Sequence, residues 1–275
     1  MSSTVRARSR ALVTGAGGTF GLRIAEGLLL KGYETICTVR DARKGEELVA
    51  RLADAAKASP NGAHVRPVVV DLADARSIAA AIAKAAGGEG GDEPLDLLVN
   101  NAAYVPQIVG PGAGEAVWDV NVRGYHNVLK AALPALLRAP APRAVLVASQ
   151  YAGGLDLDDP LYTKRAYEPH AAYKASKQAD RMLAAAWAAR QPRLAVFSCH
   201  PGIAASSVAE GLGMTFDNSV QAARAGAATP LFVATSPADK LPPSGACFVD
   251  KRHTRCAFGE NIPAVTKLWE LLENS

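Results

Sequence analysis

The sequence lacks the patterns that hold a metal ion or build a disulfide framework. None of its four cysteines forms a C-x-x-C pair, and its five histidines have no metal-ligand spacing. The cysteines are Cys37, Cys199, Cys247 and Cys256. Three of them fall in expected strands, where a buried thiol behaves as a small apolar residue. We therefore expect a reduced, cytoplasmic protein with no metal site.

Long apolar runs and an excess of one charge are also missing. The nearest candidate for a membrane span, Leu28–Leu30, is far too short, and no apolar segment of signal-peptide type follows residues 1–10. The net charge is only +4, and no basic patch carries interleaved aromatic residues, so nucleic-acid binding is not expected. With 275 residues, 49% of them hydrophobic, the chain suits one α/β domain over 1–275.

Short apolar segments alternate with helical patterns along the chain. Strands are expected at Arg10–Thr14, Glu34–Val39, His64–Val70, Leu95–Val99, Arg143–Ala148 and Leu194–Cys199. Helices are expected at Leu22–Leu30, Arg43–Lys57, Ala75–Ala86, Val117–Leu137 and Ala171–Ala189. Apolar strands that alternate with helices predict an α/β fold, a single Rossmann-type doubly wound parallel sheet with helices on both faces. The glycine-rich stretch Gly87–Pro94 is predicted to be a surface loop.

Glycines cluster where the first strand turns into the first helix. They stand at Gly15, Gly18 and Gly21, whereas the G-x-G-x-x-G pattern would need a glycine in place of Phe20. Glycine lets the backbone turn tightly and approach a pyrophosphate, and the following helix offers free N–H groups and its positive dipole end. An ordinary glycine-rich turn is the alternative, but this position between strand and helix favours dinucleotide binding.

Tyr173 and Lys177 lie four residues apart in a predicted helix, and therefore on one face of it. A nearby cation favours the phenolate, which lowers the pKa of a tyrosine towards working pH. The pair is thus a compact acid/base catalyst. Tyrosine and lysine at this spacing are also common on exposed helices, so the interpretation depends on the glycine-rich turn that precedes it.

Together these motifs resemble the short-chain dehydrogenase/reductase family over nearly the whole chain. The usual T-G-x-x-x-G-x-G is broken at Thr19, but the T-G-x-x-G-x-x-G of atypical branches is complete from Thr14. The resemblance implies catalytic roles for Tyr173, Lys177, Ser149 and Asn121, with Asn121 holding a proton-relay water. It implies cofactor contacts from Thr14, Gly15, Gly18, Thr19, Phe20, Gly21, Arg40, Asp71, Leu72, Asn101, Ala102, Tyr173, Lys177, Pro201, Gly202 and Ile203.

The end of the second strand should select the cofactor. Arginine there accommodates the 2′-phosphate of NADP, whereas an acidic group binds the ribose hydroxyls of NAD. Arg40 comes first and Asp41 follows, with Arg43 and Lys44 close behind. The segment resembles retinol dehydrogenase-like and protochlorophyllide reductase-like members, which use NADP(H). NADP(H) is therefore favoured, and NAD(H) is the alternative that Asp41 supports.

The serine that polarises the substrate carbonyl is less clearly placed. Family members often carry two serines after the fifth strand, and the second is usually catalytic; here they correspond to Ser149 and Gln150. Either side chain could donate a hydrogen bond to a developing oxyanion, and we favour Ser149. The insertion Leu155–His170 and the ending Lys267–Glu270 resemble the retinol dehydrogenase-like group. Residues 203–220 are expected to form the substrate loop.

The resemblance implies hydride transfer between NADP(H) and a carbonyl/alcohol substrate, small to medium in size and apolar. The alternative is a catalytically silent NADP(H)-binding regulator or redox sensor with the same fold. An epimerase or dehydratase is disfavoured because little sequence follows Pro201. Association into a homodimer or homotetramer through the two long helices would be ordinary for the family.

Overall fold

The computed structural model describes residues 8–87, 93–106 and 110–274, and within them it forms one sheet in the strand order β3-β2-β1-β4-β5-β6-β7-β8. All neighbouring strands are parallel except β8, which is antiparallel to β7. The strands are β1 (Arg10–Val13), β2 (Glu34–Val39), β3 (Val65–Val69), β4 (Leu97–Asn100), β5 (Arg143–Val147), β6 (Ala195–Cys199), β7 (Cys247–Val249) and β8 (Arg252–Thr254). The predicted Rossmann-type fold is confirmed, and all six predicted strands are present. Much of the predicted loop Gly87–Pro94 lies outside the described residues.

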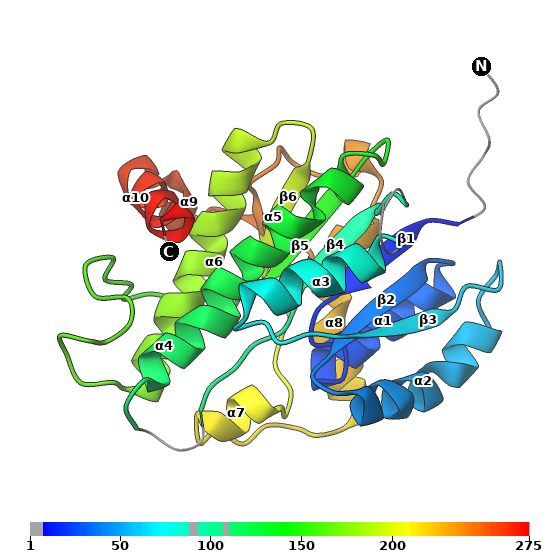
Figure 1. Ribbon diagram of the computed structural model, residues 1–275, viewed down its shortest axis with the longest axis horizontal. Helices are drawn as coiled ribbons and strands as arrows, with labels where there is room; N and C mark the ends of the chain where they lie inside the picture. Colours follow the sequence, from blue (N-terminus) through cyan, green and yellow to red (C-terminus); the bar gives the residue numbers. More distant parts are fainter. Residues whose placement is uncertain (1–7, 88–92, 107–109, 275) are drawn as a thin grey trace.

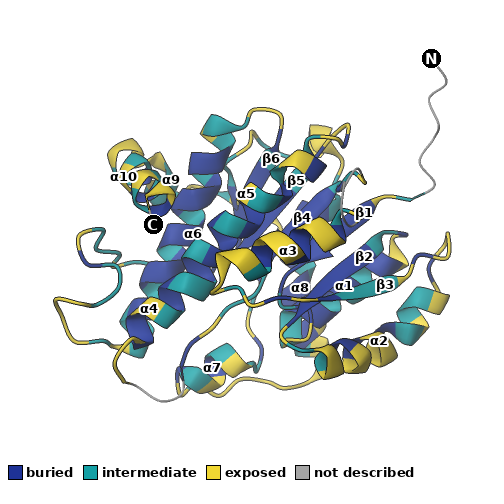
Figure 2. Cartoon of the chain, in the orientation of Figure 1, coloured by how far each residue is buried: buried dark blue, intermediate teal, exposed yellow. Residues whose placement is uncertain are grey.

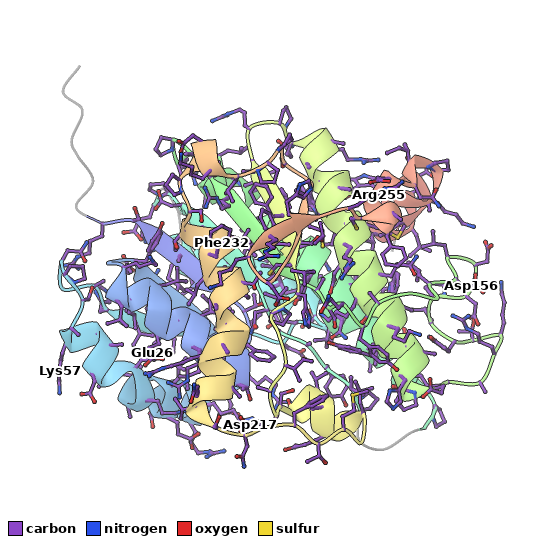
Figure 3. All side chains as sticks on the ribbon, turned by 180° about the vertical axis from the view of Figure 1, so that it is seen from behind. Glu26, Lys57, Asp156, Asp217, Phe232 and Arg255 are labelled. Carbon is purple, nitrogen blue, oxygen red and sulfur yellow. The ribbon has the colours of Figure 1, made fainter. Side chains whose placement is uncertain are left out.

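Helices cover both faces of the sheet (Figures 1 and 3). One layer consists of α1 (Thr19–Leu30), α2 (Ala42–Lys57) and α8 (Val220–Thr235). The other contains α3 (Ala75–Ala85), α4 (Ala113–Trp118), α5 (Gly124–Leu136), α6 (Pro169–Arg190) and, outside α6, α9 (Ala257–Glu260) and α10 (Ile262–Glu273). The short α7 (Ser207–Gly211) and a 3₁₀ turn (Ala238–Lys240) complete the helices of the described part. None of these helices has the length and apolar character needed to cross a lipid bilayer.

The period-two alternation of the strands divides the core into two layers. In β1, Leu12 faces the α3–α5–α6 layer, whereas Ala11 and Val13 face the α1–α8 layer. The buried strands run through the middle of the molecule, with exposed residues confined mainly to the outer helix faces and loops (Figure 2). Because helices cover both faces, the central strands β1 and β4 are fully buried, and a site is expected at the carboxyl ends of the strands.

The predicted helix Val117–Leu137 is not one regular helix. The structure divides it into α4, a π-helical turn at Asp119–Arg123, and α5. A π turn takes up one extra residue and changes which side chains face inward, and such turns are frequent at functional sites. A periodic apolar pattern does not reveal one added residue, so the sequence predicted a continuous helix. The turn contains Asn121, which is fully buried.

Candidate active site

The carboxyl ends of β1 and β4 lie side by side where the strand order reverses, the usual position of a nucleotide site in such sheets. Thr14, directly after β1, joins the two strand ends. Its Oγ1 accepts hydrogen bonds from the backbone N–H groups of Asn101, at 2.9 Å, and Ala102, at 3.1 Å. The Asn101 side chain donates in return to the Thr14 carbonyl at 2.9 Å. The predicted cofactor residues of both strands thus form one rigid corner.

The glycines of the turn after β1 have two different functions. Gly15 has a φ of +63°, and a Cβ there would lie 2.7 Å from the Cα of Ala102. A Cβ on Gly21 would lie 2.3 Å from the Gly15 carbonyl oxygen. By contrast, a Cβ on Gly17 would meet no described atom within 4 Å. Gly15 and Gly21 therefore permit close packing, whereas Gly17 faces open space and a Cβ on Gly18 would be in ordinary contact, 3.4 Å from the Gly15 carbonyl oxygen.

Helix α1 begins beside that open space without a side-chain cap. Gly18 is its N-cap, and no side chain bonds the first N–H groups. Such uncapped N–H groups and the helix dipole favour an anion. The turn therefore fits the pyrophosphate of a dinucleotide.

Two of the residues predicted to contact the cofactor also connect the turn to later segments. The hydroxyl of Thr19 donates to the Ala205 carbonyl at 2.9 Å. Phe20 packs against Gly226 of α8, where a Cβ would lie 2.1 Å from the ring. Seen from behind, α1 and α8 run together (Figure 3), and Glu26 bonds Arg224 across them at 2.9 Å. The glycine-rich turn is therefore held against the segment that follows β6.

At the end of β2 the two residues that could select the cofactor differ in their surroundings. Asp41 is the N-cap of α2, and its Oδ1 accepts a hydrogen bond from the Lys44 N–H at 2.8 Å. Arg43 pairs with Glu47 on the surface. Arg40 is exposed and has no hydrogen bond or ion pair to any described residue. The guanidinium of Arg40 is thus open to a ligand, while the Asp41 carboxylate already has a structural partner.

At the end of β3, Asp71 and Leu72 form the turn into α3. The Asp71 carboxylate accepts a hydrogen bond from the Ala73 N–H at 3.0 Å, and its own N–H donates to the Ser77 hydroxyl at 2.9 Å. Leu72 packs closely against Gly124, since a Cβ added to Gly124 would lie 2.8 Å from the Leu72 carbonyl oxygen. This ordered corner stands on the β2 side of the glycine-rich turn, and the contact of Asp71 and Leu72 with a cofactor stays a prediction.

Tyr173 and Ser149 meet at the end of β5. Ser149 follows that strand and is 6% exposed, and Tyr173 lies in the second turn of α6. Burial raises the pKa of Tyr173, and this effect exceeds the lowering by the Lys177 charge and by a hydrogen bond with Ser149. The Lys177 charge lowers the pKa of Tyr173, as predicted, but in the cofactor-free protein the phenol remains protonated at neutral pH.

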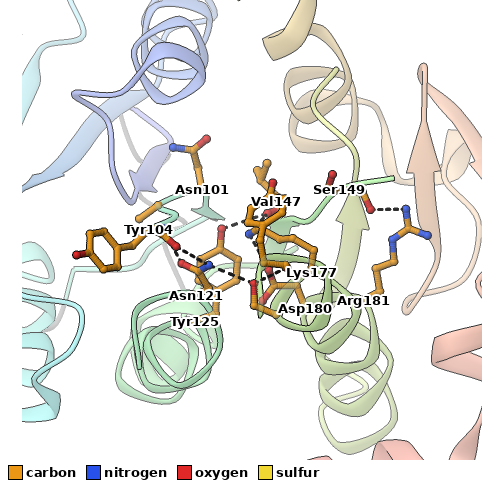
Figure 4. A network of polar contacts seen from close by, with 12 residues as sticks. Asn101, Tyr104, Asn121, Tyr125, Val147, Ser149, Lys177, Asp180 and Arg181 are labelled. Atoms are coloured by element: carbon orange, nitrogen blue, oxygen red, sulfur yellow. Dashed lines mark hydrogen bonds and ion pairs between the residues drawn. The ribbon is translucent and has the colours of Figure 1, made fainter. Parts of the chain in front are cut away.

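The Lys177 ammonium is buried at the centre of a polar network (Figure 4). Its Nζ donates to the Asp180 Oδ2 at 2.8 Å and to the Val147 carbonyl at 3.1 Å. The Tyr125 hydroxyl donates to the same carbonyl at 3.2 Å, and its ring centroid lies 5.0 Å from the ammonium. Burial opposes the charged form, but the Asp180 carboxylate outweighs it and raises the pKa of Lys177 above its ordinary value.

Asn121 clamps the π turn to its neighbours. Its Oδ1 accepts from the Tyr104 N–H at 2.7 Å, and its Nδ2 donates to the Tyr104 carbonyl at 3.1 Å and the Ser176 hydroxyl at 3.1 Å. Ser176 in turn donates to the Tyr173 carbonyl at 2.8 Å. Asn121 is thus connected to α6 through the Ser176 side chain, while its role in holding a water stays a prediction.

Ser149, not Gln150, is directed at Tyr173. The Gln150 residue is exposed, and its backbone N–H donates to the His200 Nδ1 at 3.2 Å. The Ser149 carbonyl is fixed by Arg181 at 2.6 Å, and its hydroxyl accepts from the Tyr151 N–H at 3.0 Å. This geometry favours Ser149 as the donor to a substrate oxygen.

The segment after β6 passes over the same end of the sheet. Pro201 is buried, and Gly202 adopts a φ of +99° with its missing Cβ 3.1 Å from the Cα of Gly226. Ile203 is 63% exposed, and Phe216 further along is also exposed. The segment therefore carries exposed apolar side chains, and its role as a substrate loop stays a prediction.

Sequence reasoning missed several residues of this network. They are Tyr104, Tyr125, Ser176, Asp180, Arg181 and His200, all of which contact a predicted site residue or its helix. For Asp180 a signal was present, because it follows Lys177 by one helical turn and shares its face. The others take part in hydrogen bonds to segments distant in sequence, in the case of Ser176 to Asn121, and a sequence pattern does not report such contacts.

Comparison with known proteins agrees with the fold and identifies the family. The family model for short chain dehydrogenase matches residues 9–215. The chain belongs to the short-chain dehydrogenase/reductase family. A "Probable oxidoreductase" of Streptomyces lividans is 34% identical over 189 residues, which cover 66% of this chain and 60% of that protein. Retinol dehydrogenase 13 of Homo sapiens is 30% identical over 210 residues, which cover 74% and 61%.

The chain thus spans about 60% of the length of these curated relatives. Among solved structures, salutaridine reductase from Papaver somniferum matches with a TM-score of 0.69 at 21% identity, covering 88% of this chain and 99% of that one. At this identity the likeness concerns the fold.

Proposed function

We propose that this protein is an NADP(H)-dependent oxidoreductase that transfers hydride between the nicotinamide and a carbonyl/alcohol pair. The observation that carries the proposal is the group of the half-buried Tyr173 with the buried Ser149 and Lys177, at the strand ends that also carry the uncapped glycine-rich turn. A phenol, a hydroxyl and an ammonium at one point can protonate and polarise a carbonyl oxygen. Family membership and relatives named as oxidoreductases support the same reaction.

Each residue of the group has a defined task. The bound cofactor supplies or accepts the hydride at its nicotinamide ring. Ser149 donates a hydrogen bond to the substrate oxygen, and Tyr173 gives it a proton in reduction or removes one in oxidation. Lys177 stabilises the phenolate that remains, since an adjacent cation favours the charged form. The strand-end corner of Thr14, Asn101 and Ala102 and the turn at Gly15–Gly21 would hold the dinucleotide.

NADP(H) is favoured over NAD(H) by the surroundings of two residues. The Asp41 carboxylate is engaged as the cap of α2, which leaves it poorly suited to bind ribose hydroxyls. Arg40 is exposed beside it, and a guanidinium binds phosphate bidentately. Its position after β2 is where the 2′-phosphate lies in such folds.

The substrate is proposed to be apolar. The loop 203–220 carries the exposed Ile203 and Phe216, and Tyr104 and Tyr151 are exposed on segments that adjoin Asn121 and Ser149. Apolar side chains exposed around a polar centre favour an apolar body with one carbonyl or hydroxyl group. Retinol dehydrogenase 13, one of the relatives, is named for such a substrate. We treat 1–275 as a single catalytic domain with this loop as its substrate-binding segment.

The test is NADPH oxidation against a panel of aldehydes, ketones and retinoids, with NADH as the alternative cofactor and Tyr173→Phe in parallel. We expect turnover with NADPH, a much smaller rate with NADH, and a loss of about 10²-fold or more in Tyr173→Phe. NADPH binding without turnover on any substrate would instead establish the silent regulator.

A further inference from the structure

Asp180 shares the face of α6 that carries Tyr173 and Lys177. Its carboxylate is fully buried, and one oxygen bonds the Lys177 ammonium at 2.8 Å. The same ammonium donates to the Val147 carbonyl at 3.1 Å. In Figure 4 the ammonium lies between the carboxylate and the end of β5, on the strand that leads to Ser149. Asp180 therefore fixes the lysine at the strand that carries the proposed oxyanion donor.

Folding alone does not account for this carboxylate. The second oxygen of Asp180 has no hydrogen-bond partner among the described residues, although it is buried. A buried ion pair with an unpaired oxygen is commonly no more stable than an apolar side chain of similar volume. The neighbours on the inner face of α6, Ala179, Leu183 and Ala184, are apolar, and without Asp180 the buried Lys177 ammonium would lose its counter-charge. The charge at Asp180 is therefore to be explained by what it does to Lys177.

The titratable and charged groups around the pair are few. Tyr173 lies on α6 itself, Tyr125 faces the ammonium from α5, and the thiol of Cys199 faces it from β6. From β5 only the backbone carbonyl of Val147 contacts it. Lys177 is thus the cation nearest the Tyr173 phenol, and Asp180 is the anion that directly offsets it.

We propose that Asp180 is a positioning residue that anchors the Lys177 ammonium beneath the end of β5 and offsets part of its charge, which adds to burial in favouring the protonated phenol of Tyr173. The proposal rests on the proposed function and refines it. In the reductive direction the resting site then holds the acid that the carbonyl needs. The Asp180 charge acts on Tyr173 in the same direction as burial and against the Lys177 charge.

The protonation of Asp180 itself is compatible with this role. Burial raises the pKa of Asp180 to about 7, against the lowering by Lys177. The carboxylate is thus charged above neutral pH, which is the range in which a phenol with a raised pKa loses its proton. Within that range the negative charge of Asp180 disfavours the phenolate form of Tyr173, whereas the positive charge of Lys177 favours it.

The first test titrates Tyr173 directly and needs no turnover. The ultraviolet absorbance of phenolate is followed against pH in the wild type and in Asp180→Asn, and Tyr173→Phe identifies which step belongs to Tyr173. We expect Asp180→Asn to move that step to lower pH. The matched control is Glu273→Gln, which makes the same acid-to-amide change in an ion pair between α10 and α5; it should leave the step in place. An unchanged Tyr173 step in folded Asp180→Asn would overturn the proposal.

The second test uses the pH profiles of kcat/KM in both directions. Asp180→Asn should move the profiles for alcohol oxidation and carbonyl reduction to lower pH together, since the overall equilibrium is fixed. A shift of one pH unit raises the oxidation rate on its rising limb about tenfold. A loss of rate with unmoved profiles would make Asp180 merely structural. If Asp180→Asn does not fold, Asp180→Ala replaces it, and failure of both to fold would likewise overturn the proposal.

The two proposals fail separately. A protein that turns over no substrate but shows the shifted Tyr173 titration in Asp180→Asn would refute the reductase and keep the role of Asp180. A protein that turns over substrate but shows no shift of the Tyr173 titration in Asp180→Asn would support the reductase and refute the role of Asp180.

Discussion

The cofactor side and the proton-transfer side of this site are constructed in opposite ways. On the cofactor side, around β1, α1 and β2, the important features are absent side chains and backbone groups: Gly15 and Gly21 permit contact, and Gly17 leaves space. On the proton-transfer side, around β5 and α6, the features are buried polar side chains, with Lys177 and Asp180 almost completely enclosed. One side is a surface shaped by small residues, and the other is an internal network of charges.

The difference determines how each side should respond to substitution. Adding side-chain atoms should damage the cofactor side, because its backbone segments already contact one another at Gly15 and Gly21. Removing or neutralising atoms should damage the proton-transfer side, because each buried polar group depends on a partner. Paired substitutions can test this distinction.

The largest effect is expected for Gly21→Ala. The new Cβ would lie 2.3 Å from the Gly15 carbonyl oxygen and 2.7 Å from the Asn101 side-chain nitrogen, so the backbone of the turn must move. We expect a loss of about 3 kcal/mol in the free energy of unfolding, at the upper end for an overpacked site. Urea denaturation with and without NADPH measures it.

Gly17→Ala is the control for that substitution, because its Cβ meets no described atom within 4 Å. It should leave the stability of the cofactor-free protein within about 0.5 kcal/mol of the wild type. If it also weakens NADPH binding, the space in front of Gly17 is where the pyrophosphate lies. Equal losses of stability in the two variants would break the distinction between the contact and spacing glycines.

The next effect concerns Ser149 and Gln150. Ser149→Ala removes the hydroxyl directed at Tyr173, and we expect kcat to fall by about 10²-fold or more, the usual consequence of losing an oxyanion donor. Gln150→Ala changes an exposed side chain and should leave kcat nearly unchanged. Steady-state rates with the same carbonyl substrate decide between them. The opposite ranking would assign the carbonyl-polarising role to Gln150.

The sequence predicted the cofactor side better than the proton-transfer side, and the reason is physical. Strand, turn and helix are local, so the apolar pattern and the glycines at 15, 18 and 21 predicted both the fold and the turn. Tyr173 and Lys177 were found because their spacing is also local. A family resemblance supplied Ser149 and Asn121, and the structure brings Ser149 to Tyr173.

What the sequence did not reveal depends on contacts between distant segments. Arg181 binds the Ser149 carbonyl and Tyr125 the Val147 carbonyl, and neither contact leaves a periodic signal. The π turn around Asn121 adds one residue to a helix without disturbing its apolar pattern enough to show. Buried charges such as Asp180 look, in sequence, like exposed positions.

Cofactor choice is a smaller effect, because it depends on an exposed cation. Arg40→Ala should reduce kcat/KM for NADPH by about tenfold or more, the usual size of a charge-assisted hydrogen bond, and leave the value for NADH nearly unchanged. Arg43→Ala is the matched control, since that guanidinium pairs with Glu47 on the surface. Equal losses in both variants would point to the general charge of this loop, and no loss in either would remove the basis for choosing NADP(H).

The smallest effect is expected on the outer surface of the proton-transfer side, where α10 packs against α5 and α6. There Glu273 bonds His126 and Lys130 of α5, each at 2.8 Å, and the rings of His126, Trp187 and Trp269 pack against one another. These contacts occupy part of the surface of the two long helices through which association was expected. If these Glu273 contacts hold α10 in place, ion pairs stabilise the proton-transfer side both at its buried centre and at its surface.

Acid pH should test that anchor. Burial lowers the pKa of His126 below its ordinary 6.5, despite Glu273. Hydrogen bonding from Lys130 lowers the pKa of Glu273 below its ordinary 4.5. Both groups bind fewer protons folded than unfolded, so the stability they contribute is present above those ordinary values and is lost as the pH falls through them. Glu273→Gln should be less stable than the wild type at neutral pH by under about 1 kcal/mol, and the gap should close as the wild-type carboxylate is protonated. Urea denaturation of both proteins between neutral pH and pH 4 measures the gap, and a gap independent of pH would mean that packing alone, not charge, holds α10 on this side of the molecule.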